Sequence, residues 1–488
     1  MSQKLVLCSA VFSAVFVVPS SISGTAIALP YIAQKLGSDS VLLQWVVNSF
    51  NLFFACFTLI WGAISDKWGA KHCLLTGVTL YLIASLLSAF APTLLWLDIA
   101  RACAGIGGAS VFACGSTLLM HAFSAKDHAK VFAAFGTTAG LGITLGPTMS
   151  GFLVDIFSYQ AIFIFHFLIL ALVFVLVCLL PQYQQKQQAF HFDIIGAILF
   201  LILISSLMFF IINLNDYHQV SMLTFFVFYV IIGVVFVQHQ RRRYHHDKMP
   251  FLDIAVLNNP TFVGFTLVTM IAGFSFVVLL TYFPVFLSAV FGLSASWTGV
   301  FMLALTAPML FCPILATRFL NKEMNPKLFA LIVSLMMSLG LFLLLIVLYF
   351  LSGMIQILSI LSALFIIGCG MGLHAGAIDR LALSSVDIEK SGFAAGVLNS
   401  FRLGSEALGV ALYGALMQAF IAANSSSSLH SYVSIIASGN LGLIENLELQ
   451  SEALHLYLQT FFIVIGILGI LSLLLSFAVW VLLKRQIR

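Results

Sequence analysis

Long apolar stretches, separated by short polar connections, run along almost the whole chain. A bilayer core is ~30 Å thick, so a helix that crosses it needs about 20 mostly apolar residues. Backbone groups in lipid must also bond within their own segment, which a helix achieves. The pattern therefore predicts an all-α polytopic membrane protein with fourteen spanning helices. They are expected near residues 5–30, 43–64, 73–91, 94–121, 131–153, 160–180, 194–214, 221–238, 261–288, 296–317, 327–351, 355–383, 392–422 and 457–483.

The composition excludes most soluble classes of protein. Charged residues make up 8% of the chain, whereas soluble domains carry about 25%. The connections leave no room for a soluble catalytic domain, and the chain has no HExxH, G-x-S-x-G or Walker motif. Nucleic-acid binders concentrate basic residues on one solvated surface, but here the basic residues are spread over several short loops. We therefore expect neither an enzyme nor a nucleic-acid partner.

The basic residues divide the connections into two faces. Of the 21 Lys and Arg residues, the predicted topology leaves only Lys35 on one face and three arginines inside spans. The other face collects Lys4, Lys67, Lys71, Lys126, Lys130, Lys186, Arg241, Arg242, Arg243, Lys248, Arg318, Lys322, Lys327, Lys390, Lys484, Arg485 and Arg488. The positive-inside rule makes this basic face cytoplasmic. An even number of spans places both termini there.

Two further features of composition limit the possible sites. The eight cysteines fall mostly inside apolar stretches, with no CxxC pair and no histidine cluster, so we expect core residues and neither a metal nor a cofactor. The connection at 423–456, opposite the basic face, is predicted to be a partly ordered external loop with a short interfacial helix.

Four segments carry a distinctive pattern of small and charged residues. The connection at 62–71 has the form G-x-x-x-D-K-x-G-x-K and resembles the signature loop of the major facilitator superfamily. Segment 101–109 in span four and segment 142–151 in span five resemble two more motifs of that superfamily, the second being its antiporter motif. Segment 392–411 resembles span thirteen of the fourteen-helix drug:proton antiporters.

The resemblance implies two six-helix bundles around a central cavity, which opens alternately to each side as the bundles rock. It divides the chain into an N-terminal bundle (1–185), two inserted helices with a basic cytoplasmic loop (186–250), and a C-terminal bundle with the external loop (251–488). The implied protein is a monomer in the bacterial cytoplasmic (inner) membrane, and it moves a small-molecule substrate with protons as the coupling ion.

The resemblance also assigns roles to two motifs. In the first, Gly62, Asp66, Lys67, Gly69 and Lys71 form a cytoplasmic gate. Its glycines permit tight turns and close approach, and its aspartate can accept hydrogen bonds from a helix N-terminus or pair with a basic side chain. In the second, the antiporter motif, the key residues are Gly142, Gly146, Pro147 and Gly151. Small residues allow close helix contact in lipid and proline can kink a helix, so this motif is interpreted as a hinge and seal that favours efflux.

The sequence departs from the family pattern where protons or substrate are handled. Ser21 occupies the position of the family's span-one aspartate, and Ala104 replaces a glutamine of the span-four motif. Charges inside the membrane cost ~2.5–3.5 kcal/mol on insertion scales, so those that remain are functional candidates. Asp98 lies one turn before Arg101, the motif arginine. Asp98 either supplies the missing carboxylate or lies wet at the outer interface.

A second group of candidates lies in spans twelve and thirteen. Arg402 and Glu406 are one turn apart and either form a structural ion pair or include a titrating Glu406. Asp379 and Arg380 either line the inner vestibule or cap a helix at the interface, and the cap is favoured slightly. His374, set among glycines, is interpreted first as a packing residue and second as a cavity residue.

Span two offers a third and weaker group of candidate residues. Trp45, Asn48 and Asn51 follow helical spacing there and are expected to face the cavity.

Two functions stay open at this point. The first is proton-coupled efflux of amphipathic or drug-like molecules through an apolar cavity. The second is transport, in either direction, of an anionic metabolite or siderophore, whose carboxylates Arg101, Arg380 and Arg402 would hold bidentately.

Overall fold

The protein is almost entirely helical in the computed structural model, which describes residues 3–181, 193–212, 219–245, 257–322, 324–386 and 391–484. The helices are α1 (Gln3–Leu36), α2 (Ser40–Trp68), α3 (Ala70–Ala89), α4 (Leu94–Ala122), α5 (Ala125–Ile156), α6 (Gln160–Cys178), α7 (Ile194–Ile212), α8 (Gln219–His245), α9 (Pro260–Ala272), α10 (Val278–Phe291), α11 (Ala295–Thr306), α12 (Pro308–Asn321), α13 (Pro326–Phe350), α14 (Gly353–His374), α15 (Ala377–Ser384), α16 (Ser391–Asn424), α17 (Val433–Ala437) and α18 (Leu447–Lys484). Within these ranges there are fourteen candidate membrane spans and no strand, which confirms the predicted class and number of spans.

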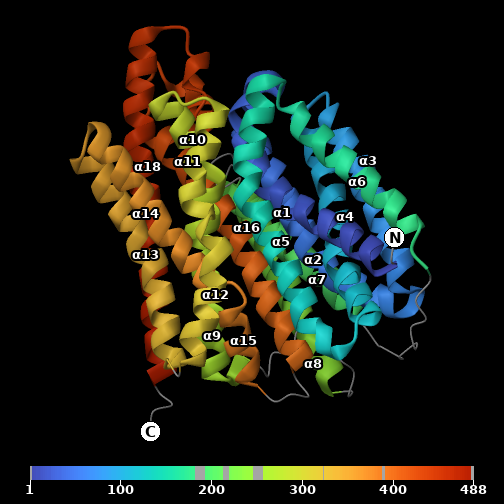
Figure 1. Ribbon diagram of the computed structural model, residues 1–488. Helices are drawn as coiled ribbons and strands as arrows, with labels where there is room; N and C mark the ends of the chain where they lie inside the picture. The colour runs from blue at the N-terminus through green and yellow to red at the C-terminus, as the bar shows by residue number, and fades with distance from the viewer. Residues whose placement is uncertain are drawn as a thin grey trace.

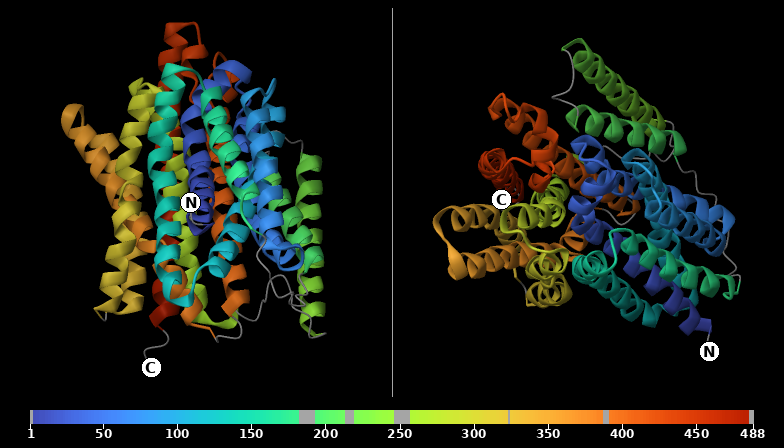
Figure 2. Two further views of the ribbon diagram at one scale, coloured as in Figure 1. Left: turned by 45° about the vertical axis from the view of Figure 1, so that its right-hand side comes forward. Right: turned by 90° about the horizontal axis from the view of Figure 1, so that it is seen from above.

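The spans form two packed halves with a helical hairpin beside them (Figure 1). Helices α1 to α6 pack together as the N-terminal half, and α9 to α18 pack as the C-terminal half. Seen from above, the α7–α8 hairpin lies at the edge of the molecule (Figure 2), and α7 contacts α2 of one half and α16 of the other. The predicted domain limits at 185/186 and 250/251 fall outside the described residues, so the division stays a prediction.

Three of the spans are each built from two helices rather than one. A π-helical turn at Gly273–Val277 joins α9 to α10, and Pro308 starts α12 directly after α11. Gly376, with φ of 75°, separates α14 from α15, a conformation that favours glycine because it has no Cβ. Breaks of this kind are tolerated inside a bilayer where protein surrounds them.

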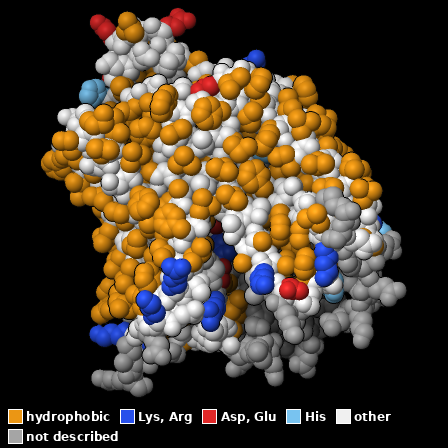
Figure 3. Space-filling view, in the orientation of Figure 1, with side chains coloured by type: hydrophobic (Ala, Val, Ile, Leu, Met, Phe, Trp, Pro, Cys, Tyr) orange, Lys and Arg blue, Asp and Glu red, His pale blue; other side chains and the backbone are white. Residues whose placement is uncertain are grey.

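The two ends of the molecule differ in charge. Figure 3 shows Lys and Arg side chains gathered toward one edge, here called the basic end, and acidic side chains on the projection at the opposite edge, the loop end. The projection contains α17 and the start of α18. Helix α18 begins at Leu447, ten residues before the predicted start near residue 457. Leu429 and Ile436 are buried against the core. The connection at 423–456 is therefore packed onto the C-terminal half along part of its length.

Glycines in α4 let the helices of the N-terminal half approach closely. A methyl group at Gly105 would overlap the backbone of Phe50 in α2, and one at Gly107 would overlap Tyr81 in α3. Small residues allow such contacts between helices in lipid. This packing fixes the position of α4, which carries Asp98 and Arg101.

A polar network fastens the basic end of the α7–α8 hairpin. Asp193 is 2% exposed and accepts hydrogen bonds from the Gly196 amide (2.9 Å), from Gln240 (3.2 Å) and from His239 Nε2 (2.8 Å). Arg243 Nε lies 3.5 Å from the same carboxylate. Burial acts to raise the pKa of Asp193, but these donors outweigh it and lower the pKa below its ordinary value. The network therefore holds the start of α7 against the end of α8.

We expect Asp193→Asn to weaken this network and to destabilise the protein at neutral pH by about 1–3 kcal/mol, since each bond to the carboxylate is charge-assisted. Because the folded pKa is lowered, the contribution is present above the ordinary carboxyl pKa of ~3.9 and disappears as the pH falls toward the folded value. Thermal unfolding of both proteins between pH 7 and pH 3 measures this. Asp127→Asn is the control. The Asp127 carboxylate accepts a hydrogen bond from the Ser124 hydroxyl, three residues away in the sequence, and is not part of the Asp193 network. A constant difference between Asp193→Asn and the parent at all pH values would contradict the assignment.

Candidate functional site

Helix α5 is pressed directly against α1 in its own half. A Cβ atom at Gly142 would overlap the backbone at Phe16 and the ring of Pro19, and one at Gly146 would overlap Ser20 and Ser23. Any larger side chain at these positions would push α5 away from α1. Two predicted residues of the antiporter motif therefore pack the N-terminal half internally.

The remaining motif residues contact the other half. A side chain at Gly151 would overlap the backbone of Ala295 in α11, and Gly299 of α11 has the same relation to Pro147. Two hydrogen bonds accompany the contact: Thr148 Oγ1 donates to the Gly299 carbonyl at 3.0 Å, and Thr144 Oγ1 donates to the Thr306 carbonyl at 3.0 Å. The motif helix therefore joins the two halves, backbone against backbone.

Asp155, which is not among the predicted site residues, lies at the loop end of this contact. Its carboxylate accepts hydrogen bonds from the backbone N–H groups of Ala295 (3.2 Å) and Ser296 (2.8 Å) at the start of α11. The first N–H groups of a helix lack partners within the helix and attract negative charge. An acidic residue just beyond a glycine-rich span was a usable signal, but the sequence did not reveal which helix start it would meet.

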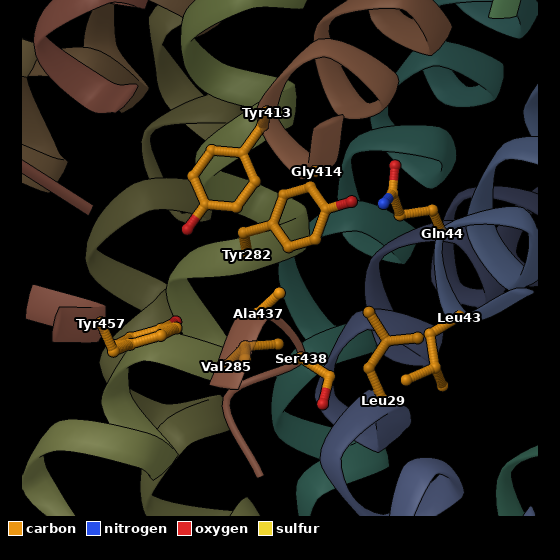
Figure 4. A pocket seen from close by; sticks show the side chains of 10 residues that line it. All are labelled: Leu29, Leu43, Gln44, Tyr282, Val285, Tyr413, Gly414, Ala437, Ser438 and Tyr457. Carbon is orange, nitrogen blue, oxygen red and sulfur yellow. The ribbon is translucent and has the colours of Figure 1, made fainter. Parts of the chain in front are cut away.

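The two halves also meet at a tyrosine cluster near the loop end (Figure 4). A cavity of about 30 Å³ lies between Leu29, Leu43 and Gln44 of the N-terminal half and Tyr282, Val285, Tyr413, Gly414 and Tyr457 of the C-terminal half, with Ala437 and Ser438 also lining it. The rings of Tyr282 and Tyr413 stack with centroids 4.1 Å apart. Ligand pockets for drug-sized molecules are ≈ 300–1,000 Å³, so this cavity holds a few waters at most. The loop end is closed, while Figure 3 shows the surface hollowed between the halves toward the basic end.

The predicted gate motif forms the turn between α2 and α3. Gly69 has φ of 87° and donates its N–H to the Ser65 carbonyl, so it is the turn glycine. Lys71 donates from Nζ to the carbonyls of Cys178 and Leu180 at the end of α6. The expected close approach at Gly62 is wrong for this conformation, since Gly62 lies inside α2 and a methyl group there would meet nothing within 4 Å. The side chains of Asp66 and Lys67 lie outside what the structure describes.

Among the charged side chains of the N-terminal half that the structure describes, Arg101 is the most buried, at 1% exposure. Its Nε donates to the Val46 carbonyl at 3.1 Å and its Nη1 donates to Ser21 Oγ at 2.7 Å. The guanidinium also lies over the Phe50 ring, 4.4 Å from the centroid, a favourable cation–π arrangement. Its Nη2 has no hydrogen-bond partner among the described residues. Ser21, at the family's aspartate position, is therefore a neutral partner for this arginine.

Asp98 is buried and not at a wet interface, with 7% exposure. Neither of its carboxyl oxygens has a hydrogen-bond partner in the described part of the chain, and no ion pair of 4 Å or less links it to Arg101 there. An unpaired buried carboxylate is costly. The wet-interface interpretation is therefore wrong, and Asp98 is an enclosed titratable group.

In the C-terminal half, Arg402 of α16 pairs with Asp379 of α15. The one-turn spacing of Arg402 and Glu406 allowed an ion pair between them, but no ion pair of 4 Å or less involves Glu406 in the described part of the chain. The break at Gly376 explains the difference, because it starts a separate helix that brings Asp379 to α16. Asp379 thus joins two helices, while Arg380 beside it is exposed at the basic end.

Glu406 lies beside the π-helical turn, a feature that the sequence did not predict. A methyl group at Gly273 would overlap the backbone at Ser405 and Glu406, and Gly409 is similarly close to the Gly273 carbonyl. The Glu406 side chain is partly buried. π-Helical turns occur often at functional sites, and this one packs against the part of α16 that carries Glu406.

His374 ends α14 directly before the break. It is 1% exposed, and its Nε2 shares a hydrogen bond of 3.2 Å with Thr269 Oγ1 of α9. The histidine therefore connects two helices of the C-terminal half.

The prediction that Trp45 faces the central cavity is wrong. Trp45 lines a crevice beside the α7–α8 hairpin, whereas Asn48 and Asn51 are buried. Both polar atoms of the Asn48 amide lack partners within the described ranges. One residue of the three thus points toward the hairpin and away from the polar interior.

Known proteins agree with this architecture. The sequence profile of the Major Facilitator Superfamily matches residues 11–410. The chain is 28% identical over 398 residues to an uncharacterized MFS-type transporter, YvkA, of Bacillus subtilis, covering 81% of this chain and 87% of the relative. It is 26% identical to the multidrug resistance protein Stp of Mycobacterium tuberculosis (81% and 73% covered) and 25% identical to the multidrug transporter protein MdtP of Bacillus subtilis (86% and 76%).

Solved structures show the same fold at low identity. A bacterial homologue of the human lysosomal transporter Spinster, in an inward-facing and unoccupied conformation, matches with a TM-score of 0.69 at 13% identity, covering 98% of this chain and 96% of that one. A D-xylose–proton symporter matches with a TM-score of 0.60 at 16% identity, covering 90% and 95%. With a family profile spanning most of its length and the fold of known transporters, this integral membrane protein belongs to the Major Facilitator Superfamily and is a transporter, not an enzyme.

Proposed function

We propose that this transporter exports amphipathic or drug-like small molecules in exchange for protons. The contact between α5 and α11 is the observation that carries the proposal, because it places the glycine-rich motif between the two halves, where it would act as a seal. Relatives named for multidrug resistance support the same substrate class at about a quarter identity. The chain would act as a monomer in the bacterial inner membrane.

The closed loop end and the hollowed basic end together correspond to one state of an alternating-access cycle. Lysines and arginines concentrate at the basic end, so we assign that end and both termini to the cytoplasm. This conformation is then inward-facing, ready to take substrate from the cell interior. In the opposite state α5 and α11 would separate and the basic end would close, with the turn at Gly69 and Lys71 as part of that gate.

Asp98 and Glu406 are the proposed proton carriers. Each is a carboxyl group within a span, one in each half, and neither forms an ion pair among the described residues. Asp379 differs because its charge is already balanced by Arg402. Binding and release of a proton at an enclosed carboxyl group changes the free energy of burying it, which links protonation to the state of the transporter.

Glu406→Gln is expected to abolish transport driven by a pH gradient and to retain counterflow exchange, since a neutral amide can no longer carry the proton. Transport of a fluorescent lipophilic cation into inverted proteoliposomes, with and without a gradient, measures both activities. Glu452→Gln, at an exposed position of α18 near the loop end, is the matched control. If Glu406→Gln keeps gradient-driven transport and Asp98→Asn loses it, then Asp98 is the carrier.

Gly151→Val is expected to force α5 away from α11 and to open the loop end. Overpacking costs ~1–3 kcal/mol, which shifts the equilibrium between the two states about 5- to 150-fold. The readout is the labelling rate of Ser438→Cys by a membrane-impermeant maleimide in a background without other cysteines. Gly136→Val in the same helix, where nothing lies within 4 Å, is the control. Equal labelling rates in both variants would rule out the seal.

The unpartnered Nη2 of Arg101 keeps the second candidate function, carriage of an anionic metabolite or siderophore, under consideration. Arg402 supports it less, since Asp379 already engages that side chain. Thermal-shift measurements with matched aromatic carboxylates and aromatic amines separate the two functions. Stabilisation by the carboxylates alone would favour the anion carrier, and stabilisation by the amines alone would favour the drug exporter.

A further inference from the structure

A crevice of about 400 Å³ lies between the α7–α8 hairpin and the N-terminal half. It is lined by residues of three helices: Trp45 and Phe53 of α2, Leu201, Ile202, Ser205, Ser206 and Phe209 of α7, and Phe225 and Phe228 of α8. Helix α7 packs against α2 and α16, while α8 packs against α7. The view from above in Figure 2 shows the hairpin at the edge of the molecule. The lining residues Phe209 and Phe228 are 39% and 48% exposed, so the crevice is open to the surroundings of the helices.

Every residue that lines the crevice belongs to a membrane-crossing stretch. Its walls come from the candidate spans Val41–Gly62, Ile194–Ile211 and Thr224–Arg243. A stretch of this length and apolarity lies within the hydrocarbon core. The crevice therefore faces the hydrocarbon chains of the bilayer and not water.

The lining offers shape and apolar surface but almost no polar recognition. None of its residues is charged, and five are aromatic. Of its two serines, Ser206 already donates its hydroxyl to the Leu203 carbonyl of its own helix. Specific ligand sites add a few convergent polar groups that fix orientation, and this crevice lacks them. Its chemistry fits a saturated or unsaturated chain with no head group inside.

The base of the crevice adjoins the boundary between the two halves. Leu52 and Cys56 of α2 and Ala407 of α16 are buried together there, with Trp45, Phe53 and Leu201 packed around them. Ala407 directly follows Glu406 in α16. A chain in the crevice would thus support α7 where it bridges α2 and α16, close to a proposed proton carrier.

We propose that the crevice binds one acyl chain of a membrane phospholipid, which fills the space between α2 and the hairpin and holds the hairpin in place. The inference is independent of substrate and proton coupling, since it requires only a bilayer and the described packing.

Trp45 is a built-in probe for the occupant. Bromine atoms on an acyl chain quench a nearby indole, and subtracting the spectrum of Trp45→Phe from that of the parent isolates Trp45 among the six tryptophans. In proteoliposomes with increasing fractions of dibrominated phosphatidylcholine, we expect Trp45 quenching to saturate at low bromolipid fractions. Ser205→Phe, which adds an aromatic ring to the lining, should abolish that saturable component.

Ile198→Phe is the matched control, because Ile198 is an exposed residue of the same helix, 47% exposed, and does not line the crevice. It should retain the saturable quenching. Native mass spectrometry of detergent-purified protein supplies an independent readout: one phospholipid should remain bound to the parent and to Ile198→Phe but not to Ser205→Phe. If Ser205→Phe does not fold, Phe228→Ala, which removes one wall, should lower lipid retention instead.

Two results would overturn the proposal. One is Trp45 quenching that rises linearly with bromolipid in the parent and in Ser205→Phe alike, which indicates bulk lipid contact. The other is relief of quenching by a micromolar amphipathic cation, which would make the crevice a substrate site.

Discussion

The close backbone contact between α5 and α11 is the constraint on which the rest of this arrangement depends. It forms because Gly151 and Gly299 carry no side chain, so that the two helices touch through their peptide groups. Directional hydrogen bonds fix the register of the two helices, which van der Waals packing alone would not do. They come from Thr144 and Thr148 and from the amides of α11 that bond the Asp155 carboxylate. Lipid provides no hydrophobic drive for helix association, so close packing of this kind must supply it.

Holding the halves together at one end determines what the other end can do. In this conformation the tyrosine cluster and the Asp155 contacts occupy the loop end, so the halves are held together there, and the hollow between them lies toward the basic end (Figure 3). Charged groups within the spans lie in both halves: the buried Asp98 and Arg101 in α4, and the partly buried Glu406 in α16. Each half therefore carries a carboxyl group within a span, and in the proposed mechanism protonation of either one would alter the free energy of the shared interface.

Much of the fold was predictable from the sequence because hydrocarbon thickness imposes a length on every span. The fourteen spans and the superfamily follow from local patterns in the sequence, and both are confirmed. The site was less predictable because its contacts join distant segments. Arg402 pairs with Asp379 across a break at Gly376 that hydropathy does not detect, and Asp98 is buried by neighbouring helices whose packing is not written in α4. Trp45 was misplaced for a related reason, since helical spacing defines a face but not the neighbour that covers it.

Because the hydrogen-bond partners of Arg101 are neutral, its positive charge can interact with the electrical potential across the membrane. The guanidinium is bonded to a carbonyl and a serine hydroxyl, so neither of these partners cancels its charge. Moving one elementary charge through 100 mV changes the free energy by ≈ 2.3 kcal/mol. In the proposed cycle, tilting of the N-terminal half would carry Arg101 and α4 through part of that field. Membrane voltage would then bias which side of the transporter is open, even for a cargo that carries no charge.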